Sequence, residues 1–218
     1  MDPSALVAQI AVVAVPLVAA VVLHEVAHGG VAWLCGDPTA QRLGRLTLNP
    51  LPHVDPVGTL LVPGLLAIAP LVLGTPPFLF GWARPVPIDP RNFRHPRRDE
   101  VLVALAGPGT NLLLAAACAL ALGALPRTEE PSLALLVIAA MLRTGIVANS
   151  VLAVFNLIPV PPLDGGRVLA ALLPFRGRRA LASFERVGMV VVLLVALNTG
   201  IVGTLVQPVV HFFFRLAQ

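Results

Sequence analysis

The sequence predicts an all-α polytopic membrane protein with about four to six membrane helices and a small β-hairpin or edge-strand region. The 218 residues are 57% hydrophobic and only 12% charged, and the mean hydropathy of +0.88 is far above that of a soluble domain. Apolar stretches recur along the chain and are separated by segments rich in proline and glycine. We therefore expect one membrane-embedded domain over residues 1–218, with a core at about 4–173 and C-terminal helices at about 180–217.

The first apolar stretch predicts a long helix from about Ser4 to about Cys35. Gly36-Asp37-Pro38 supplies the residues that end a helix. At about 1.5 Å per residue this helix is longer than a hydrocarbon core of roughly 30 Å, so it is tilted or protrudes. Because no basic region precedes it, we interpret it as a retained membrane span and not as a cleaved signal peptide.

This first helix carries the pattern His24-Glu25-Val26-Ala27-His28 near its C-terminal end. Residues four apart lie on one helix face, so the imidazoles of His24 and His28 can bind one Zn²⁺. Glu25 is then placed to take a proton from a metal-bound water, as a general base. Each ionisable group in a membrane costs about 3 kcal/mol or more without a partner, which favours a functional site.

A catalytic zinc usually has three protein ligands, and the first helix supplies two. Among carboxylates in apolar surroundings the candidate is Asp164, which lies where prolines and then Gly165-Gly166 interrupt a hydrophobic helix. The turn-rich segment 39–58, which we expect to form a short strand or hairpin, contains His53 and Asp55. Either side chain could reach the metal, or could cap or form a turn.

Two asparagines, Asn111 and Asn156, are uncharged donors on neighbouring predicted spans. Each could donate to a scissile carbonyl and its developing oxyanion, or could bond between helices. The apolar stretches that predict these and further membrane helices are 101–125, 132–155, about 187–197, and 201–216, which spans or lies in the interface. Residues 83–88 are marked by prolines and predict an extended edge segment.

Three motifs together, H-E-V-A-H, A-G-P-G-T-N and F-N-L-I-P-V-P-P-L-D-G-G, resemble the site-2 protease family of intramembrane zinc metalloproteases. The resemblance covers about residues 20–170 and includes segments similar to the compact bacterial members. It implies that His24, His28 and Asp164 bind one zinc per chain, that Glu25 is the base, and that Asn111 and Asn156 act near the substrate. The sequence departs from better-known members because it lacks a PDZ or CBS domain and a span before the first motif.

The reaction implied is peptide hydrolysis within the bilayer, as in regulated intramembrane proteolysis. The expected partners are transmembrane protein substrates and lipid, in a multi-pass protein of the bacterial inner membrane, with homo-oligomerisation left open. An unwound substrate could add as a strand to 83–88 or to the hairpin at 39–58. All 15 basic residues are arginines scattered in loops, a distribution that reflects membrane topology and excludes a nucleic-acid partner.

Two other functions remain open from the sequence. A membrane zinc transporter or a non-proteolytic zinc-binding scaffold would use the same ligands, but it has no need of Glu25 beside them. A membrane zincin of another family would take a downstream glutamate as its third ligand. The glutamates that could serve are Glu100, Glu129, Glu130 and Glu185, all in predicted loops.

Topology follows from the ligands. If His28 and Asp164 share one zinc, the first helix and the span 132–155 must run in the same direction. One full crossing at 101–125 satisfies this condition, so we expect 59–80 to be a re-entrant hairpin whose ends return to one face. The arginines of 84–98 and 176–186 predict that this face is cytoplasmic and that the N-terminus is outside.

Overall fold

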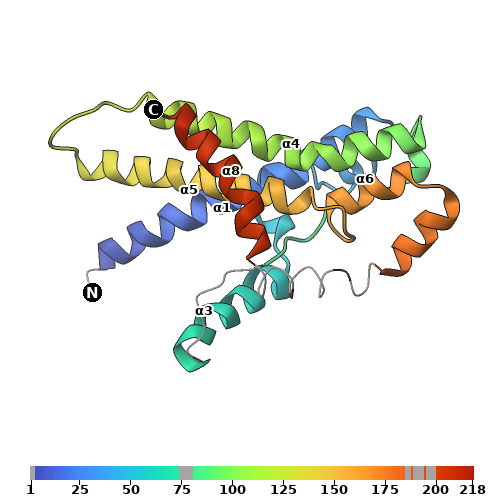
Figure 1. Cartoon of the computed structure of the whole chain (residues 1–218), viewed down its shortest axis with the longest axis horizontal. Helices are drawn as coiled ribbons and strands as arrows, with labels where there is room; N and C mark the ends of the chain where they lie inside the picture. Colours follow the sequence, from blue (N-terminus) through green and yellow to red (C-terminus); the bar gives the residue numbers. More distant parts are fainter. Residues whose placement is uncertain (1–2, 74–80, 185–187, 189–193, 195–199) are drawn as a thin grey trace.

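The computed structural model describes residues 3–73, 81–184, 188, 194 and 200–218, and within these ranges it contains helices and no strand (Figure 1). Three helices are long and apolar enough to cross a membrane: α1 (Pro3–Leu34), α4 (Pro96–Gly123) and α5 (Leu133–Asn156). In Figure 1, α1 and α5 run in the same direction and α4 runs in the opposite one. This confirms the relative directions expected for the first and third of these helices.

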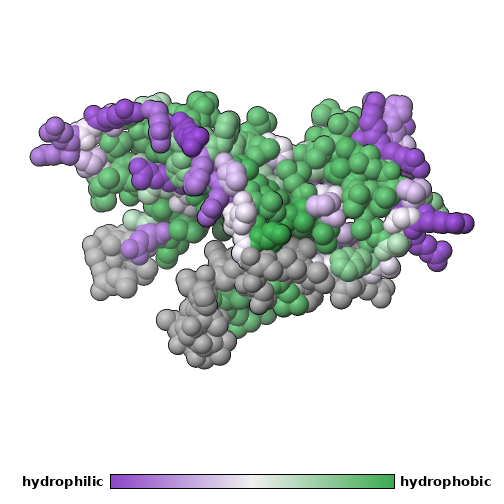
Figure 2. Space-filling view, viewed as in Figure 1, coloured by the Kyte–Doolittle hydropathy of each residue, from purple (hydrophilic) through white to green (hydrophobic). Residues whose placement is uncertain are grey.

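The three long helices pack through small residues. Ala20 of α1, Ala115 and Ala119 of α4, and Ala153 of α5 are all completely buried, which allows the backbones to approach closely. Outside this contact, hydrophobic residues cover most of the middle of the face shown in Figure 2, and hydrophilic residues gather toward its two ends. Such a surface fits a hydrocarbon core between two polar layers, so the chain is an integral membrane protein.

Two shorter helices complete the described core. α6 (Asp164–Leu172) follows the turn after α5 and packs against α4. α8 (Ile201–Leu216) lies across α4 and α5, where its Phe213 joins Ala119 and Ile146 in a hydrophobic cluster.

The expected count of about four to six membrane helices is not confirmed. Three candidate spans are found in the part of the chain that the structure describes. The predicted stretch at 187–197 lies almost entirely outside that part. The stretch at 201–216 forms α8, whose 16 residues are short for a hydrocarbon core that takes about 20.

The hairpin predicted at 39–58 is wrong. This segment instead forms α2 (Thr39–Arg42), the 3₁₀ turn η1 (Leu51–His53) and the start of the π-helical η2 (Pro56–Leu61). The prolines begin helical turns and cannot donate to a ladder, and the Asp55 side chain caps η2 by accepting from the amides of Val57 and Gly58. Residues 81–89 are assigned to neither a helix nor a strand. The edge strand predicted at 83–88 is therefore not confirmed either.

The stretch 59–80, predicted to be re-entrant, is described except for residues 74–80, and the residues at its two ends lie in contact. It begins with η2 and α3 (Val62–Leu73). At its far end the amide of Trp82 donates to the carbonyl of Gly58 at 3.1 Å, and the Thr59 hydroxyl donates to the carbonyl of Trp82 at 2.9 Å. Because these ends are in contact, the segment makes no net crossing, as a re-entrant hairpin requires.

This path predicts the outcome of a labelling experiment. Single cysteines at Val57 and Arg91, two exposed positions on either side of the hairpin, should react with a membrane-impermeant thiol reagent from the same side of sealed vesicles, the cytoplasmic one. A cysteine at Thr128, in the loop between α4 and α5, should react from the other side. Labelling of positions 57 and 91 from opposite sides would contradict this topology.

Candidate metal centre

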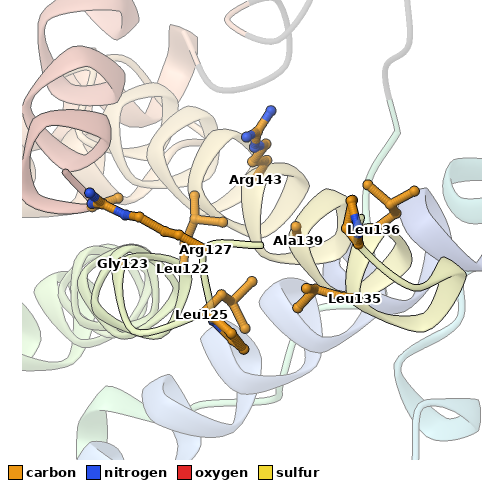
Figure 3. Close-up of a pocket in the computed structure, with 11 residues that line it drawn as sticks. Leu122, Gly123, Leu125, Arg127, Leu135, Leu136, Ala139 and Arg143 are labelled. Atoms are coloured by element: carbon orange, nitrogen blue, oxygen red, sulfur yellow. The ribbon is translucent and has the colours of Figure 1, made fainter. Parts of the chain in front are cut away.

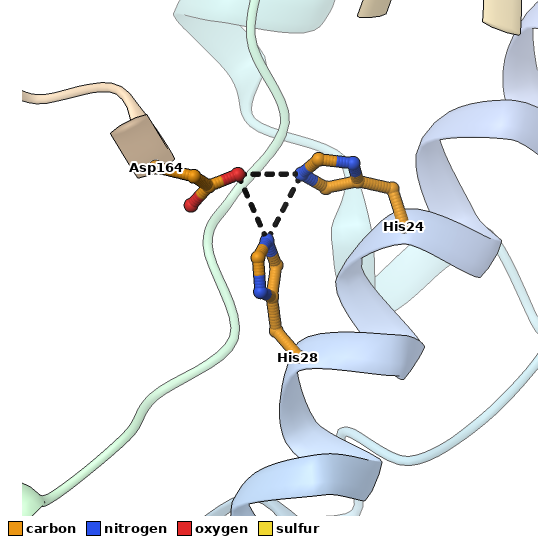
Figure 4. Close-up of side chains that lie close together, drawn as sticks. All are labelled: His24, His28 and Asp164. Atoms are coloured by element: carbon orange, nitrogen blue, oxygen red, sulfur yellow. Dashed lines mark hydrogen bonds and ion pairs between the residues drawn. The ribbon is translucent and has the colours of Figure 1, made fainter. Parts of the chain in front are cut away.

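Three buried side chains converge where α1 passes the start of α6. His24 and His28 project from one face of α1, and Asp164 is the first residue of α6 (Figure 4). The Nε2 atoms of the two histidines are 3.0 Å apart, and the Oδ2 atom of Asp164 lies 3.3 Å from the first and 3.2 Å from the second. All three residues are less than 8% exposed. They form a group that could hold a metal ion.

The triangle has the size that zinc requires. Ligand atoms about 2.0–2.1 Å from a tetrahedral Zn²⁺ are separated by about 3.3 Å, and the three observed separations are 3.0, 3.2 and 3.3 Å. The Oδ2 atom of Asp164 is buried and accepts no hydrogen bond within the described chain. A buried carboxylate oxygen of this kind calls for a cation.

Hydrogen bonds on the far side of each imidazole set which nitrogen carries the proton. The Nδ1 atom of His28 lies 2.7 Å from the carbonyl of Val103, which can only accept, so Nδ1 is the donor and Nε2 keeps its lone pair. The Nδ1 atom of His24 lies 2.6 Å from the Oδ1 atom of Asn111 in the same way. Both Nε2 lone pairs therefore face the Asp164 carboxylate, an arrangement that a cation stabilises.

Asn111 is the centre of a buried polar network between three helices. Its Nδ2 atom donates to the carbonyl of Ala20 at 3.2 Å and to the Oδ1 atom of Asn149 at 2.8 Å. Both donor hydrogens are thus used, which favours a role in orienting His24 over donation to a substrate. The sequence reasoning missed Asn149, whose only signal is a polar side chain within an apolar span. Its own amide group donates to the carbonyl of Gly145 at 2.8 Å.

Gly107 explains the small residues of the A-G-P-G-T-N motif. A Cβ atom placed on Gly107 would collide with the imidazoles of both His24 and His28. The backbone of α4 therefore forms one wall of the centre, and a side chain at this position would fill the space that the imidazoles occupy.

The turn before α6 delivers Asp164 to the histidines. The backbone of Gly165 and Gly166 lies against residues 157–161, so closely that a Cβ atom at either glycine would clash with carbonyl or proline backbone atoms. The glycines let the first turn of α6 fold back onto the end of α5, which brings Asp164 beside α1. The Arg167 guanidinium is 4.0 Å from the second carboxylate oxygen, Oδ1, and leaves Oδ2 to the histidines.

Among the other predicted site residues, Asn156, His53 and Asp55 are not members of the group, and Glu25 directly follows His24 on α1. The amide of Asn156 donates to the carbonyl of Leu152 on its own helix at 3.0 Å. His53 is buried, with Nε2 3.0 Å from the carbonyl of Thr47, and Asp55 caps η2. These contacts fit the structural roles that were left open for His53 and Asp55. Glu25 accepts a hydrogen bond at 2.8 Å from the amide of Val86.

A pocket of about 210 Å³ lies at the opposite end of α4 and α5, where Leu122, Arg127 and Arg143 are among its lining residues (Figure 3). No member of the His-His-Asp group lines this pocket. The chemistry that the metal centre supports is therefore separate from this pocket.

Comparison with known proteins identifies the family. A model described as Peptidase family M50 matches residues 127–198, which include Asp164. The chain is 39% identical over 188 residues to "Putative zinc metalloprotease YwhC" of Bacillus subtilis, an alignment that covers 83% of this chain and 77% of that protein. The chain belongs to peptidase family M50. This confirms the resemblance found in the motifs.

Two further M50 relatives share most of the length. "Putative zinc metalloprotease Rip2" of Mycolicibacterium smegmatis is 33% identical over 196 residues, covering 88% of this chain and 68% of the relative. Its namesake in Mycobacterium tuberculosis is 32% identical over 201 residues, covering 89% and 70%. No solved structure was found to match the chain. Zinc, the metal in the names of these relatives, fits the His-His-Asp group.

The Asn111 network gives a test of how the imidazoles are held. Asn111→Ala should weaken zinc binding by about 10- to 100-fold, because His24 loses the acceptor that fixes its orientation. Asn156→Ala should leave zinc affinity unchanged, since the Asn156 amide donates to Leu152 on its own helix and contacts no member of the His-His-Asp group among the described residues. Competition with a chromophoric chelator measures both. Equal zinc affinity in the wild type and Asn111→Ala would contradict the assignment.

Proposed function

We propose that this protein is a zinc-dependent intramembrane endopeptidase that cleaves membrane-spanning segments of other proteins. The observation that carries the proposal is the convergence of His24, His28 and Asp164 on one point within a bundle of membrane helices, with Glu25 next to His24. Membership of a peptidase family supports it. In this proposal the two histidines and Asp164 are the zinc ligands, one zinc per chain.

In the proposed reaction, each site residue has its own role. Zinc, when bound, supplies a Lewis acid that polarises a carbonyl and makes water more acidic. Glu25 accepts the proton of the attacking water and returns it to the leaving amine. The network of Asn111 and Asn149 holds the His24 imidazole in place. Burial of the three ligands keeps the site at low dielectric, which strengthens its electrostatic interactions.

The substrate must be unwound before it can react, because the amides of a membrane helix are closed by their own hydrogen bonds. Of the two segments expected to hold an unwound peptide, 39–58 contains α2, η1 and the start of η2, whereas 83–88 has no helix assignment and its prolines favour an extended backbone. Pro85 and Pro87 leave 83–88 with few amide donors. The amides of a bound peptide would therefore donate mainly to the carbonyl groups of residues 83–88. The two chains would form only part of a β-ladder of hydrogen bonds.

The alternatives have less support. A zinc transporter would carry metal ligands at several depths of the membrane. Among the described residues, one cluster of at least three His, Cys, Asp or Glu side chains is close enough to share a metal ion. For a zincin of another family the third ligand would be a glutamate. Glu100 instead lies 3.4 Å from Arg178 in an ion pair, Glu129 and Glu130 lie in the loop between α4 and α5, and Glu185 is outside the described residues.

The test is cleavage by purified protein in liposomes. A panel of single-span substrates should be cut within the span, chelation should stop cleavage, and added zinc should restore it. Matched soluble peptides lacking a span should be poor substrates. Zinc uptake into the liposomes with no cleavage of any substrate would overturn the proposal and favour a transporter.

A further inference from the structure

The segment Arg84-Pro85-Val86-Pro87 presents a single backbone donor beside Glu25. Proline has no amide hydrogen, so Val86 carries the only N–H of residues 85–87. That N–H donates to the Oε2 atom of Glu25 at 2.8 Å. The flanking prolines restrict the backbone to extended conformations and remove competing donors.

This segment is fixed on both sides of Val86. Upstream, the amide of Arg84 donates to the carbonyl of His53 at 2.9 Å, and the Arg45 guanidinium donates to the carbonyl of Arg84 at 2.7 Å. Arg45 is only 8% exposed, so a buried guanidinium fixes the carbonyl of Arg84.

Downstream, Asp37 holds the segment. Its carboxylate accepts from the amide of Asp89 at 2.7 Å and from the side chain of Asn92 at 2.8 Å. Burial alone would raise the pKa of Asp37, but the hydrogen bonds from Thr39, Asp89 and Asn92 hold this pKa below its usual value. The carboxylate is thus a stable, charged acceptor that ties the end of α1 to residues 89–92.

The helix face opposite the segment is shaped to receive it. Gly29 lies one turn after Glu25, and a Cβ atom there would collide with Leu46 and Val86. Val86 is only 6% exposed. The absence of a side chain at position 29 therefore allows Val86 to approach α1 closely enough for its amide to reach Glu25.

We infer that Val86 is a positioning residue whose backbone N–H orients the carboxylate of Glu25. This inference rests on the proposed function, in which Glu25 is the general base. A glutamate side chain has several rotatable bonds, and one charge-assisted hydrogen bond at Oε2 removes much of that freedom. The other oxygen, Oε1, accepts no hydrogen bond from any described residue and stays available to take a proton.

Hydrogen exchange tests the contact without any substrate. Because Pro85 and Pro87 isolate the Val86 amide, its deuterium uptake can be followed as a single site, in zinc-free and in zinc-loaded protein. Glu25→Ala should speed this exchange by at least about tenfold, since the amide loses a charged acceptor. Glu25→Gln, whose amide oxygen still accepts, should keep most of the protection. Exchange at the wild-type rate in Glu25→Ala would overturn the inference.

Kinetics test the positioning. Incorporating the α-hydroxy analogue of valine at position 86 replaces the N–H with an oxygen and keeps the side chain. This change should lower kcat by about 10- to 100-fold and leave KM and zinc content unchanged. Val86→Ala keeps the N–H and loses only side-chain contacts, so it should lower kcat by less than the backbone change does. An equal loss in Val86→Ala, or a change confined to KM, would overturn the inference.

The two tests separate this inference from the proposed function. If the wild type cleaves no membrane substrate, the proposed function fails, while exchange at Val86 still shows whether its amide holds Glu25. The other outcome is a wild type that cleaves normally together with a wild-type kcat in the protein that carries the α-hydroxy analogue at position 86. The positioning role then fails and the proposed function stands.

Discussion

Asp164→Ala is expected to lose most of the bound zinc and all detectable proteolysis, whereas the purified wild type should hold one zinc per chain. The carboxylate supplies the third corner of the triangle, 3.2 and 3.3 Å from the two Nε2 atoms. Two imidazoles alone leave the ion short of the usual three protein ligands of a catalytic zinc. Metal analysis of the purified protein measures the outcome.

Two further variants control this experiment. His53→Ala removes a buried imidazole that lies apart from the group, bonded to the carbonyl of Thr47, and should keep its zinc. Asp164→Asn preserves the size of the side chain but not its charge, and should lose zinc as Asp164→Ala does. Full zinc content in Asp164→Ala would refute the ligand assignment.

Glu25→Gln is expected to lower kcat by about 10²- to 10⁴-fold while zinc content and folding stay intact. The amide has nearly the same shape and can still accept from Val86, but it cannot take a proton at neutral pH. Cleavage of a single-span substrate, measured alongside metal content, separates the base from the ligands.

The matched control for the base is Glu25→Asp. It keeps a carboxylate on a shorter side chain, so it should retain more activity than Glu25→Gln. Turnover by Glu25→Gln equal to that of the wild type would exclude Glu25 as the base.

The candidate ligands could be predicted from the sequence because their chemistry is local. Spacing of four residues places His24 and His28 on one helix face whatever the rest of the chain does. Asp164 was identifiable because a carboxylate in a broken apolar helix needs a partner. The roles of Asn149 and Gly107 depend on which helix faces meet, and a single sequence carries no direct signal of that packing.

The β-hairpin expected at 39–58 does not form, for a physical reason. The turn-rich segment 39–58 was expected to form a short strand or hairpin, but a strand needs a neighbour that donates and accepts along its length. Prolines at 50, 52 and 56 interrupt the donors and start helical turns. Prolines at 85 and 87 likewise remove amide donors from residues 83–88, where the amides of Arg84 and Val86 donate to His53 and to Glu25. The parity of crossings was a better guide to the relative directions of α1 and α5, because it depends on the position of the ligands and not on local propensity.

The polar contacts of the candidate ligands connect the helices of the bundle, so zinc binding is expected to stabilise the folded protein. His24 and His28 belong to α1 but are anchored on α4, Asn111 links α4 to α5, and Asp164 begins α6. An ion bound only by the assembled bundle stabilises it by about 4 kcal/mol when free zinc is a thousand times Kd. Zinc depletion should therefore lower the unfolding temperature of the whole bundle, and a cell starved of zinc would lose the protein to degradation as well as to inactivity.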